Sequence, residues 1–485
     1  MITNFKNLRV TVMGLGLHGG GVGAVEFLAK QGAKVLVTDL KDKQKLKESL
    51  KQLKKHKNIK FVLGQHRSED FIKTDLVIKN PAVNPGSRYL EIAKKNKVPI
   101  ETEMGLFFNL CPCPIIGITG SKGKSTTASL IYKLLATKRE NVHLAGNIRI
   151  SALSQLKKLT KKSLCVLELS SWQLDDIFEK KRSPAIAVVL NIIPDHLDRY
   201  KNFQDYIEAK KTIFRHQRKK DILILNHQDL ITRSFSDQAK SQVIFFGTEI
   251  GKEKLSTNQR GAYIKKGAIY FGNEEKAIAK LKDVNLKGQH NIFNVLAAVT
   301  LTKLYKLPNQ NIARVLEHFS GPEGRLQLVG KQKKVLFYND TAATIPEATI
   351  AAIKSFDNKK KIVLISGGQD KGLDYAKLAE VIAQRVKSLI LLSGTASDKI
   401  YYELQSVLGK GKKFSNLLVA RNVKDMKEAI LLALEKGAGG SVVLLSPGAA
   451  SFNLFENEFD RGGQFEAVVK SLNFKLNGQP QKKKR

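Results

Sequence analysis

The fold is decided by one stretch, Gly117-Ile-Thr-Gly-Ser-Lys-Gly-Lys-Ser-Thr126, which follows an apolar run and opens a helical pattern. A glycine-rich turn at the start of a helix aims several backbone N–H groups at one point, where the helix dipole favours negative charge. Lys124 adds a mobile cation, and the Ser125 hydroxyl can hold a magnesium ion. The stretch therefore predicts a strand, a phosphate-binding loop and a helix. A plain glycine turn would explain only the glycines, although Ile118 stands where the standard loop has its first glycine.

Two apolar runs downstream, residues 164–167 and 186–190, predict further strands. They are nearly continuous, as strands buried on both faces of a parallel sheet are. Each run ends in polar residues, Glu168 after the first and residues 191–198 after the second. Parallel strands present their carboxyl ends at one edge of a sheet, so we expect a ligand crevice there.

The N-terminal part reads as a strand, a glycine turn, a helix and a second strand that ends at Asp39. This βαβ unit predicts another parallel sheet. Taken alone, Gly14, Gly16, Gly19 and Asp39 suggest a dinucleotide site, and a purely structural turn is the alternative. The spacing does not separate a dinucleotide from another nucleotide.

The rest of the chain alternates in the same way. Residues 221–273 are richer in short strands, and we expect a small antiparallel patch there. Strands at residues 335–338, 362–365, 389–392 and 442–445, with helices between them, predict a second doubly wound sheet. We therefore expect an α/β protein of three domains: N-terminal Rossmann-like (1–112), central mononucleotide-binding with a parallel sheet (113–319) and C-terminal Rossmann-like (320–478), followed by a basic tail (479–485).

The charge is unusual, with 82 Lys and Arg against 44 Asp and Glu and a net charge of +38. Such a balance is typical of proteins with nucleic-acid or other anionic partners. The lysines are spread along the chain, however, without an arginine-rich arm or aromatic residues interleaved with a basic stripe. We expect solvated lysine faces rather than a nucleic-acid interface.

Composition indicates an ordinary globular protein, since 42% of the residues are hydrophobic and 26% are charged. No apolar run is long enough to cross a bilayer, and residues 1–6 lack the layout of a signal peptide. The three cysteines are too few for a zinc site, and we expect them to be reduced. These features predict a cytoplasmic protein without a membrane partner.

Six segments together resemble the Mur ligases, the amide-forming enzymes of peptidoglycan precursor synthesis. The first is the phosphate loop itself, and the others follow in the order of that family. They are Glu168-Leu-Ser-Ser-Trp-Gln-Leu174, Asn191-Ile-Ile-Pro-Asp-His-Leu-Asp-Arg-Tyr200, Gln289-His-Asn-Ile-Phe-Asn294, Gly367-Gly-Gln-Asp-Lys-Gly372 and Leu445-Ser-Pro-Gly-Ala-Ala-Ser451. Each segment is weak alone, whereas the ordered set spans nearly the whole chain and is specific.

The resemblance implies an ATP-dependent ligase that adds D-glutamate to UDP-N-acetylmuramoyl-L-alanine through an acyl phosphate, with ATP and Mg²⁺ as cofactors. It implies UDP-sugar, ATP and amino-acid sites in the first, second and third domains, and we expect a monomer. The alternatives are a sister Mur ligase with a different amino acid, a folylpolyglutamate synthase, and a basic nucleic-acid-binding protein that has lost catalysis. Residues 1–110 argue against the synthase, whose family lacks such a leading domain.

The resemblance also assigns residues to the ATP and metal sites. Four are implied to be catalytic: Lys124, Glu168, His196 and Lys210. The metal ligands are Ser125, Glu168, His196 and Lys210, the last as a carbamate. The residues implied to bind ATP are Gly120, Ser121, Lys122, Gly123, Lys124, Ser125, Thr126, Asn291, Asn294, Arg325 and Asp340. A satisfied helix-surface pair is the alternative for Asn291 and Asn294.

The two substrate sites are assigned by the same resemblance. The UDP-sugar would contact Gly16, Leu17, His18, Asp39 and Asn147. The amino acid would contact Thr344, Lys371, Ser451 and Phe459. Two positions depart from the family pattern: Gly324 stands where many D-glutamate ligases have histidine, and Ala342 where several have lysine.

Overall fold

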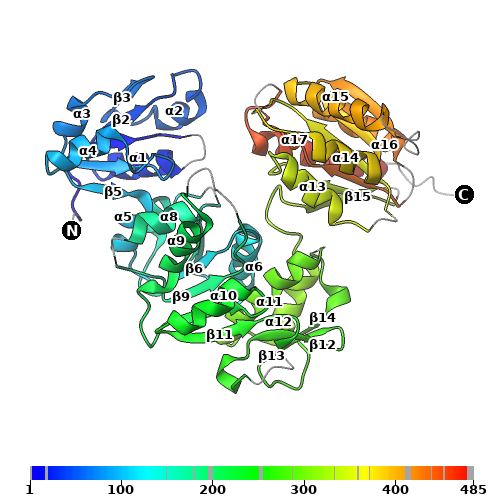
Figure 1. The fold of residues 1–485 in the computed structure, drawn as a ribbon, viewed down its shortest axis with the longest axis horizontal. Coiled ribbons are helices and arrows are strands. Elements are labelled where there is room, and N and C mark those ends of the chain that lie inside the picture. The colour runs from blue at the N-terminus through cyan, green and yellow to red at the C-terminus, as the bar shows by residue number, and fades with distance from the viewer. Residues whose placement is uncertain are drawn as a thin grey trace, which may run out of the picture. The chain divides into compact units, whose positions relative to one another are not determined.

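The computed structural model describes thirteen segments of the chain, which form two compact units (Figure 1). The segments are residues 3–16, 20–148, 150–178, 181–194, 200–250, 255–286, 288–332, 334–357, 360–370, 372–409, 417–437, 440–451 and 454–477. Unit 1 comprises residues 1–284 and 290–317, and unit 2 comprises residues 285–289 and 318–485. Each unit is described by itself below.

Unit 1 begins with a five-stranded parallel sheet in the order β3-β2-β1-β4-β5. Its strands are β1 Arg9–Met13, β2 Lys34–Asp39, β3 Ile59–Leu63, β4 Leu76–Lys79 and β5 Ile100–Thr102. Side chains that alternate along β1 serve two cores, because Val10 and Val12 pack with helix α1 while Met13 packs with α3 and α4. The helices are α1 Gly20–Lys30, α2 Lys47–Leu53, α3 Glu69–Ile72, α4 Arg88–Lys95 and α5 Glu103–Leu110.

The second sheet of unit 1 has six parallel strands in the order β11-β10-β9-β6-β8-β7. They are β6 Ile115–Thr119, β7 Val142–Gly146, β8 Leu164–Glu168, β9 Ile186–Val189, β10 Ile222–Asn226 and β11 Gln242–Phe246. The central strands β6 and β8 are buried along their whole length, as their apolar sequences require. Consequently the polar residues that follow them lie together at the carboxyl edge.

The helices around this sheet have the following bounds. They are α6 Lys124–Ala136, α7 Ala152–Gln155, α8 Ser171–Phe178, α9 Phe203–Arg215, α10 Leu230–Ser234, α11 Gln289–Leu304 and α12 Asn309–His318. One apolar core joins the N-terminal sheet, the central sheet and helices α8 and α9.

The predicted antiparallel patch is smaller than expected. Residues 222–226 and 242–246 form β10 and β11, which are parallel strands of the central sheet, so that part of the prediction was wrong. Only β12 Ala262–Lys265, β13 Ala268–Phe271 and β14 Ala279–Lys280 form an antiparallel sheet. The misreading arose because a short buried strand has the same composition in either kind of sheet.

Unit 2 holds a six-stranded sheet in the order β15-β16-β20-β17-β18-β19. The strands are β15 Gln327–Gln332, β16 Val335–Asn339, β17 Ile362–Gly367, β18 Val386–Leu392, β19 Leu418–Val423 and β20 Val442–Leu445. All neighbours are parallel except the edge hairpin of β15 and β16. Ile362 and Leu364 face one core, and Val363 and Ile365 face the other.

Helices cover both faces of this sheet (Figure 1). Residues of α13 Pro346–Lys354, α14 Ala376–Arg385 and α15 Thr395–Gly409 pack in the first core, and residues of α16 Met426–Lys436 and α17 Glu458–Asn477 pack in the second. The predicted α/β class with parallel sheets is therefore confirmed. Among the described residues, no helix is long and apolar enough to cross a membrane.

Candidate functional site

The phosphate loop joins β6 to α6 at the carboxyl edge of the central sheet. Gly120 and Gly123 have φ values of +155° and +85°, which glycine adopts readily and other residues do not. A Cβ atom on Gly123 would lie 2.2 Å from Asn294 Oδ1. Glycine at position 123 is thus required both by the turn and by the helix packed against it.

The loop is held to the end of the neighbouring strand β9. Asn191 accepts hydrogen bonds from the amides of Ser121, through its carbonyl at 2.8 Å, and of Lys122, through Oδ1 at 2.9 Å. The Ser121 hydroxyl donates to the carbonyl of Ile193 at 2.9 Å and lies 2.9 Å from the Tyr206 hydroxyl. These bonds fix the loop before any ligand binds, so little ordering entropy is left for the binding step.

The Lys124 ammonium lies within the loop. It donates to the carbonyl oxygens of Gly120 at 2.9 Å and Ser121 at 2.8 Å. Carbonyl oxygens are weaker partners for a cation than a phosphate, since charge-assisted pairs are the stronger hydrogen bonds. A phosphate in the loop would therefore take over Lys124.

Lys210 reaches the same loop from helix α9. Its side chain is only 1% exposed, and Nζ donates to Gly120 O at 3.1 Å and Thr119 Oγ1 at 3.3 Å. The Tyr206 ring lies 4.8 Å from the same nitrogen. A fully buried lysine beside a phosphate loop is costly for stability, which makes Lys210 a candidate for a functional role.

The adjacent Lys211 points elsewhere. Its ammonium pairs with Glu208 at 2.7 Å and lies over the Phe235 ring. Of the two neighbouring lysines, only Lys210 contacts the phosphate loop in the described structure. This geometry supports the choice of Lys210, which the sequence register alone left uncertain.

Glu168 ends β8 beside the loop and is 1% exposed. Its Oε1 accepts a hydrogen bond from Asn147 Nδ2 at 3.0 Å, whereas its buried Oε2 has no hydrogen-bond partner among the described residues. An unsatisfied buried carboxylate oxygen is unfavourable unless a cation binds it. Hard oxygen ligands such as Glu168 and the buried Ser125 hydroxyl fit Mg²⁺.

Asn291 and Asn294 lie on α11, and both are buried, at 6% and 3% exposure. Asn294 Nδ2 donates to Asn291 Oδ1 at 2.9 Å, and Thr127 at the start of α6 donates to Asn294 Oδ1 at 3.3 Å. The pair therefore does not form a solvated helix surface. Asn294 lies against the phosphate loop at Gly123 and Thr127, and the contact of the pair with a nucleotide stays a prediction.

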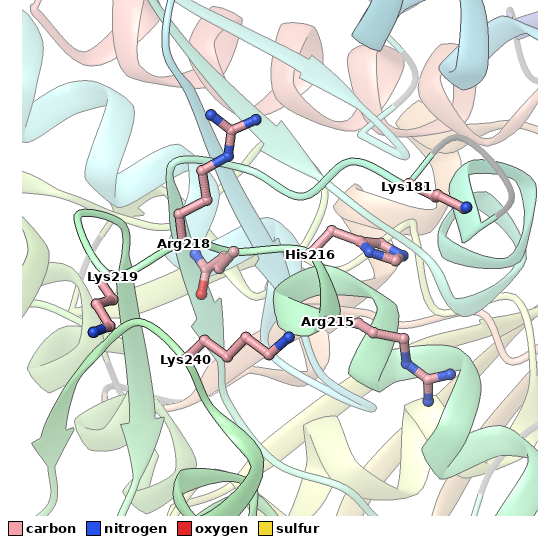
Figure 2. A pocket seen from close by; sticks show the side chains of 7 residues that line it. Lys181, Arg215, His216, Arg218, Lys219 and Lys240 are labelled. Carbon is pink, nitrogen blue, oxygen red and sulfur yellow. The ribbon is translucent and has the colours of Figure 1, made fainter.

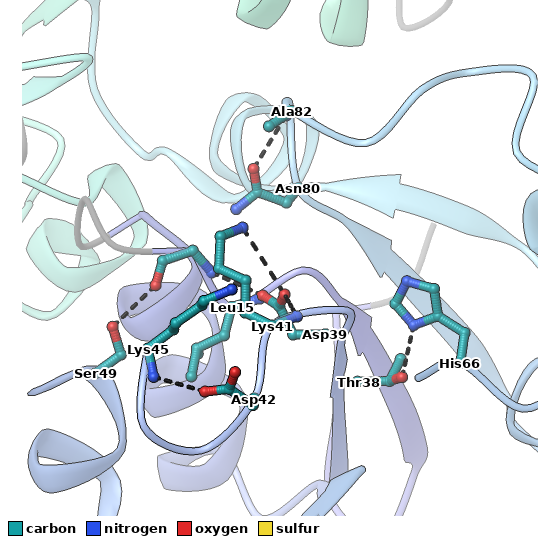
Figure 3. A network of polar contacts seen from close by, with 11 residues as sticks. Leu15, Thr38, Asp39, Lys41, Asp42, Lys45, Ser49, His66, Asn80 and Ala82 are labelled. Atoms are coloured by element: carbon teal, nitrogen blue, oxygen red, sulfur yellow. Dashed lines mark hydrogen bonds and ion pairs between the residues drawn. The ribbon is translucent and has the colours of Figure 1, made fainter. Parts of the chain in front are cut away.

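The N-terminal glycine turn is organised around Asp39 (Figure 3). One carboxylate oxygen of Asp39 accepts hydrogen bonds from the amides of Leu15 at 2.9 Å and Gly16 at 3.2 Å, and the other accepts from the Lys41 amide at 2.9 Å. Asp39 is buried, and Ser49 donates to the carbonyl of Gly16. In this structure Asp39 fixes the turn, while its contact with a uracil or ribose stays a prediction.

A second carboxylate lies near this turn. Glu103 is buried, and its Oε1 accepts a hydrogen bond from the Ser151 hydroxyl at 2.5 Å. A Cβ atom on Gly20, the first residue of α1, would lie 3.0 Å from Glu103 Oε2. Burial raises the pKa of Glu103 to about 7.

In unit 2, Arg461 organises the predicted amino-acid site, and the sequence analysis missed it. The side chain is fully buried, and it donates to Thr341 Oγ1, to the Thr341 carbonyl and to the Ala449 carbonyl at 3.0–3.2 Å. These bonds tie the segments that carry Thr344, Ser451 and Phe459 to one another. The only sequence signal was an arginine two residues after Phe459, in a helix that contains other charged and polar residues.

Asp340 directly follows strand β16 and is buried. Its oxygens accept hydrogen bonds from the Leu326 amide at 3.0 Å and the Ser446 hydroxyl at 2.7 Å. Burial raises its pKa to about 7, although the neighbouring Arg325 acts in the opposite direction. Asp340 thus joins the entrance of unit 2 to the loop after β20.

The two departures from the family pattern contact each other. The Ala342 amide donates to the Gly324 carbonyl at 2.9 Å. Gly324 has φ of +69°, and a Cβ atom there would lie 2.8 Å from Thr341 Cγ2. This backbone conformation favours glycine at position 324. Because residues 324 and 342 are joined by a hydrogen bond, the two departures from the family pattern lie at the same place in the structure.

Several predicted residues lie outside the described part of the chain. They are Leu17, His18, Gly19, His196, Lys371 and the tail at 479–485. Among the described residues, Gln369 exchanges backbone hydrogen bonds with Ala450 at 2.9 and 3.1 Å. Gln369 therefore lies next to the segment that carries Ser451.

A strand, a glycine loop and a helix at the carboxyl edge of a parallel sheet are the architecture of a nucleotide-binding α/β protein. Comparisons with known families narrow this class. Residues 8–102 match the Mur ligase MurD-like N-terminal domain, residues 118–302 the Mur ligase middle domain, and residues 324–448 the Mur ligase glutamate ligase domain. The chain belongs to the Mur ligase family.

Curated relatives agree over nearly the full length. The UDP-N-acetylmuramoylalanine–D-glutamate ligase of Roseiflexus sp. (strain RS-1) is 42% identical over 475 residues, covering 96% of this chain and 98% of the relative. The ligase of the same name from Borreliella afzelii (strain PKo) is 38% identical, covering 97% and 99%. The fold is similar to that of the UDP-N-acetylmuramate–alanine ligase of Thermotoga maritima, with a TM-score of 0.60, 19% identity and coverage of 96% and 100%.

Proposed function

We propose that this chain joins D-glutamate to UDP-N-acetylmuramoyl-L-alanine in an ATP-dependent reaction of peptidoglycan precursor synthesis. The observation that carries the proposal is the buried Lys210 hydrogen-bonded to the phosphate loop of a chain that is 42% identical to a ligase of that name. Substrate carboxylate, ATP and D-glutamate are all anionic, so the reaction requires cations at the point where they meet.

The phosphate loop supplies the first of the cations that the reaction requires. Backbone amides at the start of α6 and the Lys124 ammonium hold the terminal phosphates of ATP, and the helix dipole adds to the attraction. Asn291 and Asn294 contact the adenine, and Arg325 and Asp340 of unit 2 contact phosphate and ribose. The substrate carboxylate would then attack the terminal phosphorus of ATP, which releases ADP and forms the acyl phosphate. The amine of D-glutamate would attack the acyl carbon, form the amide and displace inorganic phosphate.

The metal would be held by Ser125, Glu168, His196 and the carbamate of Lys210. The unpartnered Oε2 of Glu168 and the buried Ser125 hydroxyl support this assignment. When bound, Mg²⁺ polarises the phosphate oxygens and neutralises charge that develops during transfer. Asn147 positions the Glu168 carboxylate through its hydrogen bond to Oε1.

The two substrates occupy the other parts of the chain. Gly16, Leu17, His18 and Asp39 of the N-terminal domain, with Asn147, bind the UDP-sugar. Thr344, Lys371, Ser451 and Phe459 bind D-glutamate, and Arg461 positions the segments that carry them. A lysine is a suitable partner for the side-chain carboxylate of the amino acid. We place the protein in the cytoplasm, where its nucleotide substrates are made. We expect it to be a monomer.

The proposal is tested by phosphate release from ATP with the UDP-sugar and each of five amino acids. D-Glutamate should be used well, D-glutamine poorly and L-alanine hardly at all, because an analogue without the carboxylate leaves the cation that would bind it without its charged partner. Comparable turnover with L-lysine or diaminopimelate would reject D-glutamate and leave a sister ligase. Omission of the UDP-sugar should abolish the release in every case.

A further inference from the structure

A pocket of about 530 Å³ opens on the central domain (Figure 2). Six of its seven lining residues are basic, and they are Lys181, Arg215, His216, Arg218, Lys219 and Lys240. The seventh is Gln217. None of these residues belongs to the ligase machinery proposed above.

The pocket lies at the opposite edge of the sheet from the phosphate loop. Its residues come from the segments that precede three adjacent strands, β9, β10 and β11, and so mark the amino edge. The phosphate loop follows the carboxyl end of β6 in the same sheet. A five-residue strand separates the two edges by about 17 Å. A ligand here would therefore lie outside the phosphate loop.

Hydrogen bonds of the buried Gln217 hold the base of the pocket in place. Gln217 is 3% exposed, and its Nε2 donates to the carbonyls of Pro184 and Ile222, both at 2.9 Å. Its Oε1 accepts a hydrogen bond from the Ser241 hydroxyl at 2.8 Å. One buried amide thus joins the segments before all three strands, and it holds the basic side chains around a fixed space.

The charge of the pocket is only partly neutralised. Arg215 pairs with Glu208, and Asp221 accepts a hydrogen bond from the backbone amide of Arg218. Within the part of the chain that the structure describes, no carboxylate forms an ion pair with the side chains of Arg218, Lys219 or Lys240. The remaining positive charge is available to a ligand.

The ring of His216 also has a polar atom without a partner. Its Nε2 is buried and has no hydrogen-bond partner among the described residues. Burial lowers the pKa of His216, and the nearby Arg215 and Lys181 lower it further. An anion in the pocket would relieve this repulsion, and an imidazole N–H could donate to it.

We propose that this pocket binds a small anion with two or more linked phosphate groups, such as a free oligophosphate or the phosphate chain of a nucleotide. Several convergent cations suit closely spaced phosphates better than a single carboxylate. The pocket has a limited volume, and the described residues that line it include no Phe, Tyr or Trp. The ring of Phe178, which contacts His216, is covered by Arg215. Single-stranded nucleic acid is instead held by a groove with free aromatic platforms.

The test measures binding of inorganic tripolyphosphate to the full-length chain by titration calorimetry. The Lys124→Ala variant serves as background, so that the phosphate loop does not contribute. Two triple variants are compared in it: Arg218→Ala with Lys219→Ala and Lys240→Ala, and a matched control that removes three exposed lysines of the N-terminal domain, Lys51→Ala with Lys54→Ala and Lys57→Ala.

One saturable site should be present in the background and in the control, and it should be at least about tenfold weaker in the pocket variant. The His216 ring resonances should shift on titration, which keeps the test valid if the triple variant is unstable. Equal weakening in both triple variants, or no saturable binding, would overturn the proposal. So would equal affinity for inorganic phosphate and tripolyphosphate, or displacement of tripolyphosphate by a stoichiometric amount of single-stranded RNA. If the nucleotide form is the ligand, adenosine triphosphate should compete for the same site.

Discussion

Two glycine turns of unit 1 follow parallel strands and open helices, yet they are completed by opposite charges. The turn after β1 encloses the Asp39 carboxylate, which takes the amides of Leu15 and Gly16. The loop after β6 encloses the Lys124 ammonium, which rests on carbonyl oxygens. Backbone amides already bound to a carboxylate attract an anion less, whereas a lysine held by carbonyls is ready to exchange them for phosphate. The same strand–turn–helix motif is thus specialised by one side chain.

Among the changes that test this comparison, removal of the Lys124 cation should have the largest effect on activity. We expect Lys124→Ala to lower kcat/KM for ATP by at least about 10³-fold, because it removes charge stabilisation from the phosphoryl transition state. UDP-sugar binding should stay unchanged in calorimetry. Lys133→Ala, at the exposed end of the same helix, is the control and should be near wild type. Near-normal turnover of Lys124→Ala would end the assignment of this loop to ATP.

The next largest effect is expected at the buried lysine. Lys210→Ala should reduce turnover by about 10²-fold or more, since its charge or its carbamate lies beside the transferred phosphate. Lys211→Ala, which loses the pair with Glu208 and the contact with the Phe235 ring, should reduce it less than about threefold. Acetate should partly rescue Lys210→Ala, and bicarbonate should restore wild type that has been depleted of carbon dioxide at low pH. Equal losses in the two variants would contradict the role given to Lys210.

A smaller effect is expected from the loop glycine. Gly123→Ala and Gly267→Ala share a positive φ, and each should lose about 1 kcal/mol of stability. A Cβ atom at position 123 would collide with Asn294, while a Cβ atom on Gly267 would meet nothing within 4 Å. Thermal unfolding should therefore shift in both variants, and KM for ATP should rise about tenfold in Gly123→Ala alone. A normal KM in Gly123→Ala would show that the loop tolerates rearrangement.

The N-terminal turn is probed by Asp39→Asn. This change replaces one of the two accepting oxygens with an NH₂ donor, so at least one of the three backbone amides bound by Asp39 loses its acceptor. We expect a loss of about 1–3 kcal/mol in stability and a higher KM for the UDP-sugar. KM for ATP should not change. The exposed Asp42 accepts one hydrogen bond from the Lys45 amide, so Asp42→Asn is the control. An effect of Asp39→Asn on ATP rather than on UDP-sugar would reverse the specialisation of the two turns.

The smallest effect concerns pH and the second carboxylate near the N-terminal turn. The folded-state pKa of Glu103 is raised to about 7 from an ordinary value of 4.5. Folding therefore favours the protonated form, and the stability that it contributes below pH 4.5 is lost as pH rises through about 7. The stability of Glu103→Gln relative to wild type should rise between pH 5 and pH 8 in denaturant titrations. A constant difference between the two proteins would show that Glu103 does not titrate there.

Strong local signals could be predicted from the sequence. The phosphate loop, the apolar strands and the ordered family segments specified three α/β sheets, because continuous apolar runs and glycine turns have few structural solutions. Short strands were less clear, and β10 and β11 were placed in an antiparallel patch because pairing partners distant in sequence leave no local trace.

In the candidate site, too, residues within local motifs could be predicted and residues that depend on distant contacts could not. Lys124 and Glu168 were located by the motifs that surround them, and Lys210 rested on the family resemblance. Arg461 was missed, because its function depends on a side chain buried among backbone carbonyls of residues 341 and 449. The basic pocket was missed as well, since its cations are brought together by three loops that are far apart in the sequence.

The central claim is that the loop after β6, completed by Lys124, holds the phosphates of ATP, whereas the turn after β1 does not. A crystal structure of the chain soaked with ADP and Mg²⁺, without UDP-sugar, tests it most directly. The β-phosphate should accept hydrogen bonds from the backbone amides of residues 123–125, with Lys124 Nζ moved from the Gly120 and Ser121 carbonyls onto the phosphate. Density for the ADP phosphates at the Gly14 turn, with Lys124 still on the two carbonyls, would contradict the claim.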